Sequence, residues 1–250
     1  MSDKIVIIPT YNERDNIVDI IKEVLALLGG FNVLIIDDGS PDGTAGLVKS
    51  IQSLHPNRIF LVERSGKLGL GTAYITGFKY ALERGYNYIF EMDADFSHNP
   101  KDLIRLHQAC VDGAELAIGS RYVTGVNVVN WPMTRVLMSY YASWYVRRIT
   151  AMTIRDATAG FKCYRAEVLR SIDLDKVRFV GYAFQIEMKF TSWLLGFKIV
   201  EVPIIFTDRT KGQSKMSSGI FKEAAFGVLQ LKINSLFNKP KRNAPPATAF

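Results

Sequence analysis

The sequence predicts an α/β protein built on a mostly parallel β-sheet with helices on both faces. Three observations indicate this class. Short apolar runs recur through the first 120 residues, and segments with apolar residues at helical spacing separate them. Strands that are apolar throughout are typical of parallel sheets, because both of their sides are buried under helices. Polar clusters directly follow four of these runs, at the edge where such sheets bind ligands.

The elements alternate regularly in the first half of the chain. The predicted strands are residues 4–8, 33–36, 59–62, 86–90 and 116–119. The predicted helices are residues 16–28, 44–54, 72–83 and 102–111. Pro9 closes the first strand because proline has no amide hydrogen to donate to the next strand, and Gly29-Gly30 closes the first helix.

The second half is less regular. We predict helices at 131–152, 184–195 and 220–237, strands at 160–164 and 198–206, and a polar loop at 207–218. The helix at 131–152 is rich in Trp and Tyr, and the helix at 220–237 carries one broad apolar face that includes Val228 and Leu229. The tail at 238–250 is basic and rich in proline, and we expect it to be disordered.

Composition limits the classes of function. A net charge of +7 and a pI near 9.3 favour an anionic partner such as a nucleotide, a lipid phosphate or a membrane surface. No helix-turn-helix, zinc-finger or RNP-like pattern accompanies the charge, so we expect no nucleic-acid partner. The two cysteines have no metal-ligand spacing, so we expect free thiols in a reducing compartment. No uncharged apolar run approaches the roughly 18 residues of a membrane-spanning helix, so we expect no membrane span. The N-terminus leads straight into a strand, so we expect no signal peptide.

The segment Glu91-Met92-Asp93-Ala94-Asp95 carries the strongest chemical signal. It follows an apolar strand and precedes a turn, so two carboxylates are held close together. Like charges at this distance are costly unless a cation lies between them. Oxygen ligands suit Mg²⁺ or Mn²⁺, which share their remaining positions with substrate phosphates. The pattern predicts a divalent cation that holds a nucleotide diphosphate, although Asp-x-Asp alone also occurs in exposed turns.

Three further clusters fit a nucleotide site, and each has a simpler explanation. Residues 9–13 (Pro-Thr-Tyr-Asn-Glu) offer Tyr11 to stack on a base and Glu13 to accept hydrogen bonds, or they form a capping turn. Residues 37–40 contain two aspartates where a tight turn needs one. Residues 209–215 offer basic side chains for phosphates, or they form a solvated loop. The glycine loop at 66–71 lacks both the Walker A ending and the third glycine of a dinucleotide fingerprint.

Taken together, these segments resemble the family 2 glycosyltransferases, and most closely the dolichol-phosphate (polyprenol-phosphate) mannose synthases. The resemblance covers about residues 4 to 237. Besides the clusters above, the resemblance rests on five further segments: Lys-x-Gly-Leu-Gly at 67–71, Gly-Ser-Arg-Tyr at 119–122, Asp-Ala-Thr-Ala-Gly-Phe at 156–161, Phe-Gln-Ile-Glu at 184–187 and Gln-Ser-Lys-Met at 213–216.

The resemblance implies one glycosyltransferase A-type domain over residues 1–237. Residues 1–122 would bind the nucleotide, and residues 123–237 would face the acceptor and the membrane. It also implies Mg²⁺ or Mn²⁺, GDP-mannose as donor and a polyprenyl or dolichyl phosphate as acceptor. The implied guanosine-pocket residues are Pro9, Tyr11, Glu13, Ile36 and Asp38.

For the centre of the site, the resemblance assigns Asp93 and Asp95 to the metal and diphosphate, with backbone contacts from Ala94. Ser97 stands where some members have a metal-binding glutamine, and a serine hydroxyl is a weaker ligand. The implied phosphate-contacting residues are Arg121, Arg209 and Lys215.

An acceptor phosphate is already ionised near neutral pH, so the reaction needs no enzyme nucleophile and little general-base help. We therefore expect direct displacement with inversion, giving a β-mannosyl phosphate. A UDP-glucose-dependent polyprenyl-phosphate glucosyltransferase is the first alternative, and a non-catalytic nucleotide- or lipid-binding module is the second. A protein partner cannot be deduced from the sequence.

A lipid acceptor is reached at a membrane surface. The helices at 131–152 and 220–237 are candidates for lying at this surface, since the first combines Trp and Tyr with arginines and the second contains charges that exclude spanning. Ordinary core helices are the alternative. We expect a cytoplasmic protein bound peripherally at the cytoplasmic face of a membrane.

Overall fold

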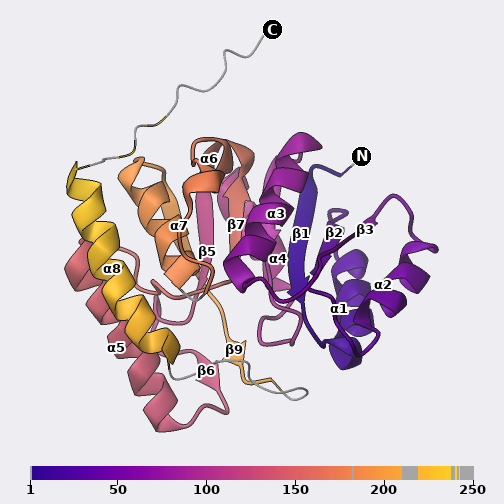
Figure 1. Cartoon of the computed structure of the whole chain (residues 1–250), viewed down its shortest axis with the longest axis horizontal. Helices are drawn as coiled ribbons and strands as arrows, with labels where there is room; N and C mark the ends of the chain where they lie inside the picture. Colours follow the sequence, from indigo (N-terminus) through magenta and orange to yellow (C-terminus); the bar gives the residue numbers. More distant parts are fainter. Residues whose placement is uncertain (1, 182, 210–218, 238–239, 241, 243–250) are drawn as a thin grey trace, which may run out of the picture.

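The computed structural model describes residues 2–181, 183–209, 219–237, 240 and 242, and it describes no side chains from 219 to 225. Its centre is a seven-stranded sheet in the order β3-β2-β1-β4-β7-β5-β8 (Figure 1). The strands are β1 (Lys4–Thr10), β2 (Asn32–Asp37), β3 (Ile59–Glu63), β4 (Tyr88–Glu91), β5 (Leu116–Ser120), β7 (Lys162–Arg165) and β8 (Ile199–Pro203). All neighbours are parallel except at β7, which runs antiparallel to β4 and β5.

Strand register brings the acidic clusters to one edge of the sheet. Thr10 at the end of β1 pairs with Asp37 at the end of β2. On the other side of β1, Ile7 pairs with Glu91, so the chain leaves β4 towards Asp93 at this same edge. The parallel arrangement therefore places the segments that follow β1, β2 and β4 next to one another.

Helices cover both faces of the sheet and bury a separate apolar cluster on each. One face is covered by α1 (Arg14–Ala26), α2 (Thr44–Gln52) and α4 (Asp102–Val111). The other is covered by α3 (Leu70–Glu83), α6 (Ala166–Arg170) and α7 (Ala183–Leu194). Strand β1 separates the two clusters, and its buried residues point to both sides, Val6 and Ile8 to one and Ile5 and Ile7 to the other. The predicted mostly parallel sheet with helices on both faces is confirmed.

Two longer helices, α5 (Met133–Thr150) and α8 (Gly219–Phe237), pack together at the end of the molecule away from β3 (Figure 1). Within the described residues, no helix combines the length and the apolar character needed to cross a membrane. Beside them, β6 (Val128–Val129) and β9 (Phe206–Thr207) form a two-stranded sheet. Of the tail at 238–250 only Pro240 and Arg242 are described, and Arg242 pairs with Glu115 at 2.7 Å.

The structure corrects several predicted elements. The single strand expected at 198–206 is two strands, because Pro203 ends β8 and the chain continues into β9. The short elements β6, α6 and a 3₁₀ turn at Leu174–Lys176 were not predicted. On α8, Val228 is buried whereas Leu229 is 39% exposed, so these two members of the predicted apolar face have different surroundings.

Candidate active site

A cavity of about 420 Å³ opens at the edge of the sheet where the acidic segments meet. It is lined by ten of the residues predicted from the sequence: Pro9, Tyr11, Glu13, Asp38, Asp93, Ala94, Asp95, Ser97, Arg121 and Arg209. Ile36 does not line it, because its side chain is fully buried in the core cluster under α3. Lys215, together with the segment at 213–216, lies outside the described residues.

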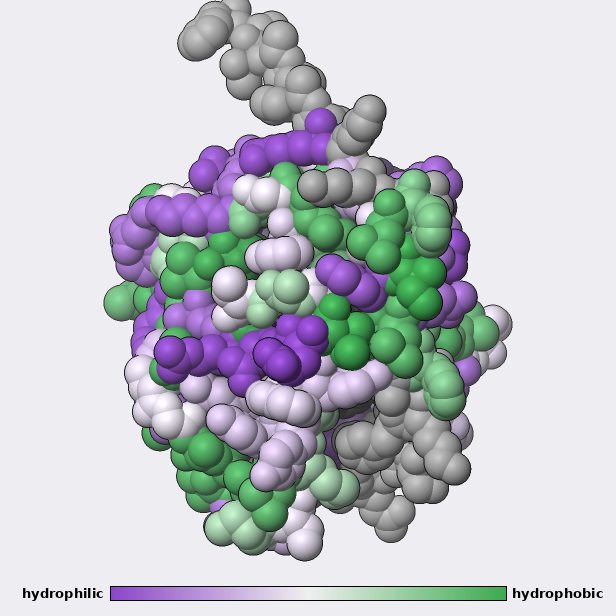
Figure 2. Space-filling view, turned by 90° about the vertical axis from the view of Figure 1, so that its left-hand side faces the viewer, coloured by the Kyte–Doolittle hydropathy of each residue, from purple (hydrophilic) through white to green (hydrophobic). Residues whose placement is uncertain are grey.

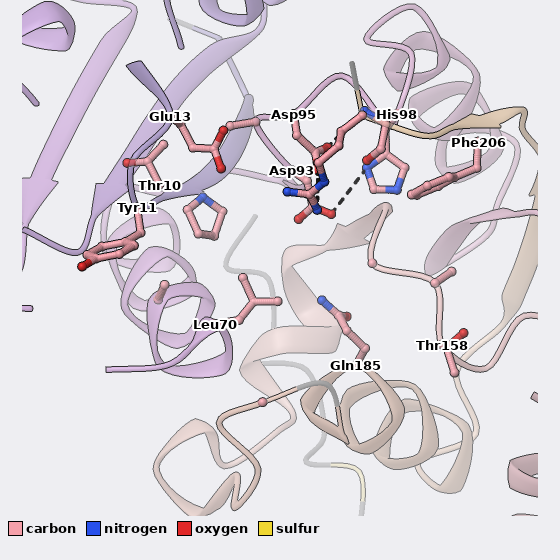
Figure 3. A pocket seen from close by; sticks show the side chains of 18 of the residues that line it. Thr10, Tyr11, Glu13, Leu70, Asp93, Asp95, His98, Thr158, Gln185 and Phe206 are labelled. Atoms are coloured by element: carbon pink, nitrogen blue, oxygen red, sulfur yellow. Dashed lines mark hydrogen bonds and ion pairs between the residues drawn. The ribbon is translucent and has the colours of Figure 1, made fainter. Parts of the chain in front are cut away.

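The turn after β4 holds Asp95 in a fixed orientation. Phe96 adopts a left-handed backbone conformation (φ 59°), which is uncommon for a bulky residue. The amide of Ser97 thereby donates a hydrogen bond to Asp95 Oδ1 at 3.1 Å, while Asp95 Oδ2 meets the guanidinium of Arg209 at 3.0 Å. Residues in such uncommon backbone conformations cluster at active sites and ligand-binding turns, where they orient neighbouring side chains. Here the turn aims a carboxylate into the cavity (Figure 3).

Asp93 lies in a strongly acidic environment. Its side chain is 41% exposed, towards the cavity. The surrounding protein removes much of its water, and Asp95 and Glu91 add negative charge, so its pKa is raised to about 7. His98 Nδ1 lies 4.0 Å from Asp93 Oδ2. Burial lowers the pKa of His98 to about 4, so its ring is neutral near pH 7 and does not relieve the acidic charge.

The donor set fits a Mg²⁺ or Mn²⁺ ion that shares its coordination with a ligand. Two buried polar atoms beside the carboxylates, Ser97 Oγ and His98 Nδ1, have no hydrogen-bond partner within the described part of the chain. That part contains no group of three or more His, Cys, Asp or Glu side chains able to hold a metal ion by itself. One or two carboxylates completed by waters and substrate phosphates are the usual arrangement for Mg²⁺. Asp93 and Asp95 match this arrangement.

The raised pKa of Asp93 predicts how the stability of the metal-free protein depends on pH. An unfolded aspartate loses its proton near pH 4, whereas folded Asp93 keeps it until about pH 7. Between these values the folded state binds more protons, so this group's stabilisation is present below pH 4 and is lost as pH rises through 7. Urea melts in EDTA should show a smaller loss of stability over this range for Asp93→Asn than for the wild type. Identical pH profiles for the two proteins would contradict the assignment.

At the end of the neighbouring strand β2, Asp37 and Asp38 have different roles. Asp37 is the turn residue: its carboxylate accepts hydrogen bonds from Thr10 Oγ1 at 2.8 Å and from the amide and hydroxyl of Ser40. Asp38 takes no part in these turn contacts, and it lines the cavity. Glu13 also lines it and lies at the start of α1. Asp38 thus lines the same cavity as Glu13 and Tyr11, and Figure 3 shows the latter two side chains near each other.

Arginines surround the acidic centre. Arg121 is buried, and its Nε and Nη2 bind the two carboxylate oxygens of fully buried Asp156 at 2.7 and 2.6 Å. Arg135 was not predicted as a site residue. It reaches the cavity from α5, pairs with Asp208 at 2.8 Å and stacks on Trp131. Its position links the α5 helix to the acidic edge, and its only sequence signal is an arginine in the first turn of an aromatic-rich helix.

The wall opposite the carboxylates comes from α7. Gln185 points into the cavity there (Figure 3), and its amide Nε2 donates to Glu91 at 2.8 Å while its Oε1 accepts a hydrogen bond from Lys162. Glu91 and Lys162 form a completely buried ion pair at 3.1 Å. Glu187 does not line the cavity. It accepts hydrogen bonds from the backbone amides of Arg178 and Phe179 and so has a structural role.

Comparison with known proteins shows the family. Residues 5–173 match the model of "Glycosyl transferase family 2". The polyprenol monophosphomannose synthase of Mycolicibacterium smegmatis is 46% identical over 237 residues, covering 95% of this chain and 89% of the relative. The undecaprenyl-phosphate mannosyltransferase of Micrococcus luteus is 46% identical over 222 residues, covering 89% of this chain and 90% of the relative.

Solved structures show the same fold at low sequence identity. Glucosyl-3-phosphoglycerate synthase from Mycobacterium tuberculosis, in complex with Mn²⁺, UDP and glucosyl-3-phosphoglycerate, superimposes with a TM-score of 0.61 at 18% identity and covers 95% of this chain and 80% of its own. A mannosyltransferase from Pyrobaculum calidifontis in complex with GDP-Man and Mn²⁺ gives 0.56 at 15% identity, covering 94% and 74%.

The sheet, its acidic edge and these likenesses define an α/β enzyme of the glycosyltransferase A-type class. The chain belongs to glycosyl transferase family 2.

Proposed function

We propose that this enzyme transfers mannose from GDP-mannose to a polyprenyl phosphate, with inversion, giving a polyprenyl β-mannosyl phosphate and GDP. The observation that carries the proposal is the pair Asp93 and Asp95 in a cavity that Arg121, Arg135 and Arg209 also line. The names of the two 46% identical relatives support the sugar and the acceptor class. The GDP-Man complex of the Pyrobaculum calidifontis enzyme supports the donor.

In this proposal the protein brings two anionic groups together. When bound, Mg²⁺ or Mn²⁺ held by Asp93 and Asp95 would neutralise charge on the departing diphosphate. Arg209 lies beside Asp95, and Arg121 and Arg135 lie on the cavity wall, so their charges offset the repulsion between donor and acceptor phosphates. The acceptor oxygen attacks as an already ionised phosphate, and no side chain has to remove a proton.

Donor and acceptor are tested by incubating the full chain with labelled GDP-mannose or UDP-glucose and a polyprenyl phosphate, with Mn²⁺ or with EDTA. The proposal expects label in the lipid phase from GDP-mannose with Mn²⁺, and none with EDTA. Transfer from UDP-glucose alone would favour a glucosyltransferase. Binding of a nucleotide without transfer from either donor would favour a non-catalytic module.

The outward side of α5 and α8 supports contact with a lipid surface. Its exposed apolar side chains are Met133, Leu137, Met138, Tyr140, Tyr141 and Trp144 on α5 and Phe226, Leu229, Ile233, Leu236 and Phe237 on α8. Figure 2 faces this side and shows apolar side chains in groups between hydrophilic ones. Trp and Tyr beside aliphatic residues are typical of helices at the lipid headgroup level. We infer peripheral binding at the cytoplasmic face of a membrane.

Removing this apolar surface should weaken binding to lipid. Met138→Ser, Tyr141→Ser and Trp144→Ser combined should lower partition into anionic vesicles at least roughly tenfold, because large apolar side chains no longer enter the interface. Sedimentation with vesicles measures this partition. Leu28→Ser with Leu54→Ser is the matched control: these leucines are even more exposed, but they follow α1 and α2, and the variant should bind like the wild type. Equal partition of all three proteins would contradict the membrane surface.

A further inference from the structure

Arg64 connects three segments around the nucleotide end of the cavity without lining the cavity itself. It directly follows β3, and its side chain is 8% exposed. Its Nε and Nη2 bind Asp38 Oδ1 at 2.7 and 2.6 Å. Its Nη1 donates to Thr72 Oγ1 at 2.7 Å, and Nη2 also approaches the carbonyl oxygen of Gly69 at 3.4 Å. One guanidinium therefore holds the turn after β2, the glycine loop and the start of α3.

The first consequence concerns Asp38. Both contacts from Arg64 go to the same carboxylate oxygen, Oδ1. The other oxygen, Oδ2, accepts no hydrogen bond from any residue that the structure describes. Because Asp38 lines the cavity and Arg64 fixes its plane, Oδ2 is a pre-oriented acceptor for a ligand N–H or O–H group.

The second consequence concerns the glycine loop. Lys67, Gly69 and Leu70 line the cavity. The hydroxyl of Thr72, besides accepting a hydrogen bond from Arg64, donates one to the Gly69 carbonyl at 2.8 Å.

The segment before α7 contacts the glycine loop on the side away from Arg64. The amide of Gly71 donates to the Val180 carbonyl at 2.8 Å. Gly69 has a φ of +101°, and a Cβ there would lie 2.9 Å from the same carbonyl oxygen. The loop is thus fixed between Arg64 and the segment that leads into α7, with little room to move.

We propose that Arg64 is a positioning residue for the nucleoside of the donor: it sets Asp38 Oδ2 and the loop at 67–70 as one preformed surface for the base and ribose. This inference rests on the proposed function and on the guanosine pocket that the family resemblance implies at Asp38. The planar guanidinium is essential, because its donors reach three partners in one plane. A lysine at this position keeps the charge but presents a single ammonium group.

The test compares Arg64→Lys and Arg64→Gln with the wild type by titration calorimetry in Mn²⁺, using GDP and inorganic pyrophosphate as separate ligands. Loss of an oriented, charge-assisted contact should raise the Kd for GDP roughly 10- to 100-fold in both variants. Pyrophosphate has no nucleoside, so its Kd should stay within about twofold. In turnover assays KM for the donor should rise by far more than kcat falls.

Two further variants complete the design. Arg165→Lys alters an arginine that pairs with Glu167 at 3.3 Å and lines no described cavity, and it should bind GDP normally. Thr72→Val keeps the pair between Arg64 and Asp38 but removes the hydrogen bonds that join Arg64 to the loop through the Thr72 hydroxyl, and it should raise the Kd for GDP roughly 3- to 10-fold. If an Arg64 variant fails to fold, Thr72→Val tests the inference in its place.

Three results would overturn the inference: normal GDP affinity in the Arg64 and Thr72 variants, full restoration by lysine, or equal losses for GDP and pyrophosphate. A wild type that binds neither GDP nor UDP would instead refute the proposed function.

Discussion

Asp95→Asn is expected to lower the rate of mannosyl transfer by about 10³-fold, the order of effect seen when a group that stabilises developing negative charge is removed. Asparagine keeps the side-chain shape and the oxygen that accepts the Ser97 amide hydrogen bond at 3.1 Å. It loses the charge that, together with Asp93, would hold the cation, and it loses the ion pair with Arg209. The effect should therefore fall on catalysis and leave the fold intact.

Two measurements separate these effects. Free Mn²⁺ measured by electron paramagnetic resonance should show weaker binding to Asp95→Asn, while the thermal midpoint should stay close to that of the wild type. Asp102→Asn is the matched control, because Asp102 pairs with Arg105 on α4 and lies outside the acidic turn. Normal transfer by Asp95→Asn, or transfer by the wild type that EDTA does not affect, would contradict the metal-holding role.

Asp156→Asn should produce the largest loss of stability, about 3–5 kcal/mol, because it leaves the buried guanidinium of Arg121 without its counter-charge. For a chain of this size, that corresponds to a midpoint lower by roughly 6–20 °C. Asp156 is fully buried and accepts hydrogen bonds from the amide, Nε and Nη2 of Arg121. Thr158 Oγ1 also accepts a hydrogen bond from this guanidinium at 2.8 Å, but it brings no negative charge.

The pH dependence gives a second readout of the same pair. Burial alone would raise the pKa of Asp156, but the charge and hydrogen bonds of Arg121 outweigh it, so the pKa lies below its usual value. A lowered pKa means that the stabilisation is present above the pKa of an unfolded aspartate and is lost as pH falls through the lowered value. Chemical unfolding between pH 3 and 7 should show this loss in the wild type and not in Asp156→Asn. Asp173→Asn, at an exposed pair with Lys176, is the control, and equal small effects of the two substitutions would contradict the account.

The clearest strand predictions were those for β1 and β2, whose surroundings are uniform. β1 and β2 read as apolar runs because helices bury both of their sides. The direction of β7 could not be predicted, since the residues of a short strand carry no information about the direction in which it pairs. Lys162 even suggests an exposed position, yet it is fully buried because Glu91 on the neighbouring strand supplies its counter-charge.

The candidate site was predictable where the chain itself sets the geometry. Asp93 and Asp95 follow one strand directly, so their proximity is local. The different roles of Asp37 and Asp38 were not predictable, because they depend on Thr10 at the end of β1 and on Arg64 just after β3. Arg135 was missed for the same reason: it lies on α5, far along the chain from the acidic turn, and only the tertiary structure brings it to the cavity.

The central claim is that Asp93 and Asp95 hold a divalent cation against the diphosphate of the donor. Its most direct test is a crystal of the full chain soaked with Mn²⁺ and GDP-mannose, with an anomalous difference map recorded at the manganese edge. The account predicts a single strong peak about 2.1 Å from oxygens of both carboxylates and in contact with the diphosphate. Density for the nucleotide with manganese absent from this turn, or with the diphosphate bound elsewhere, would contradict it.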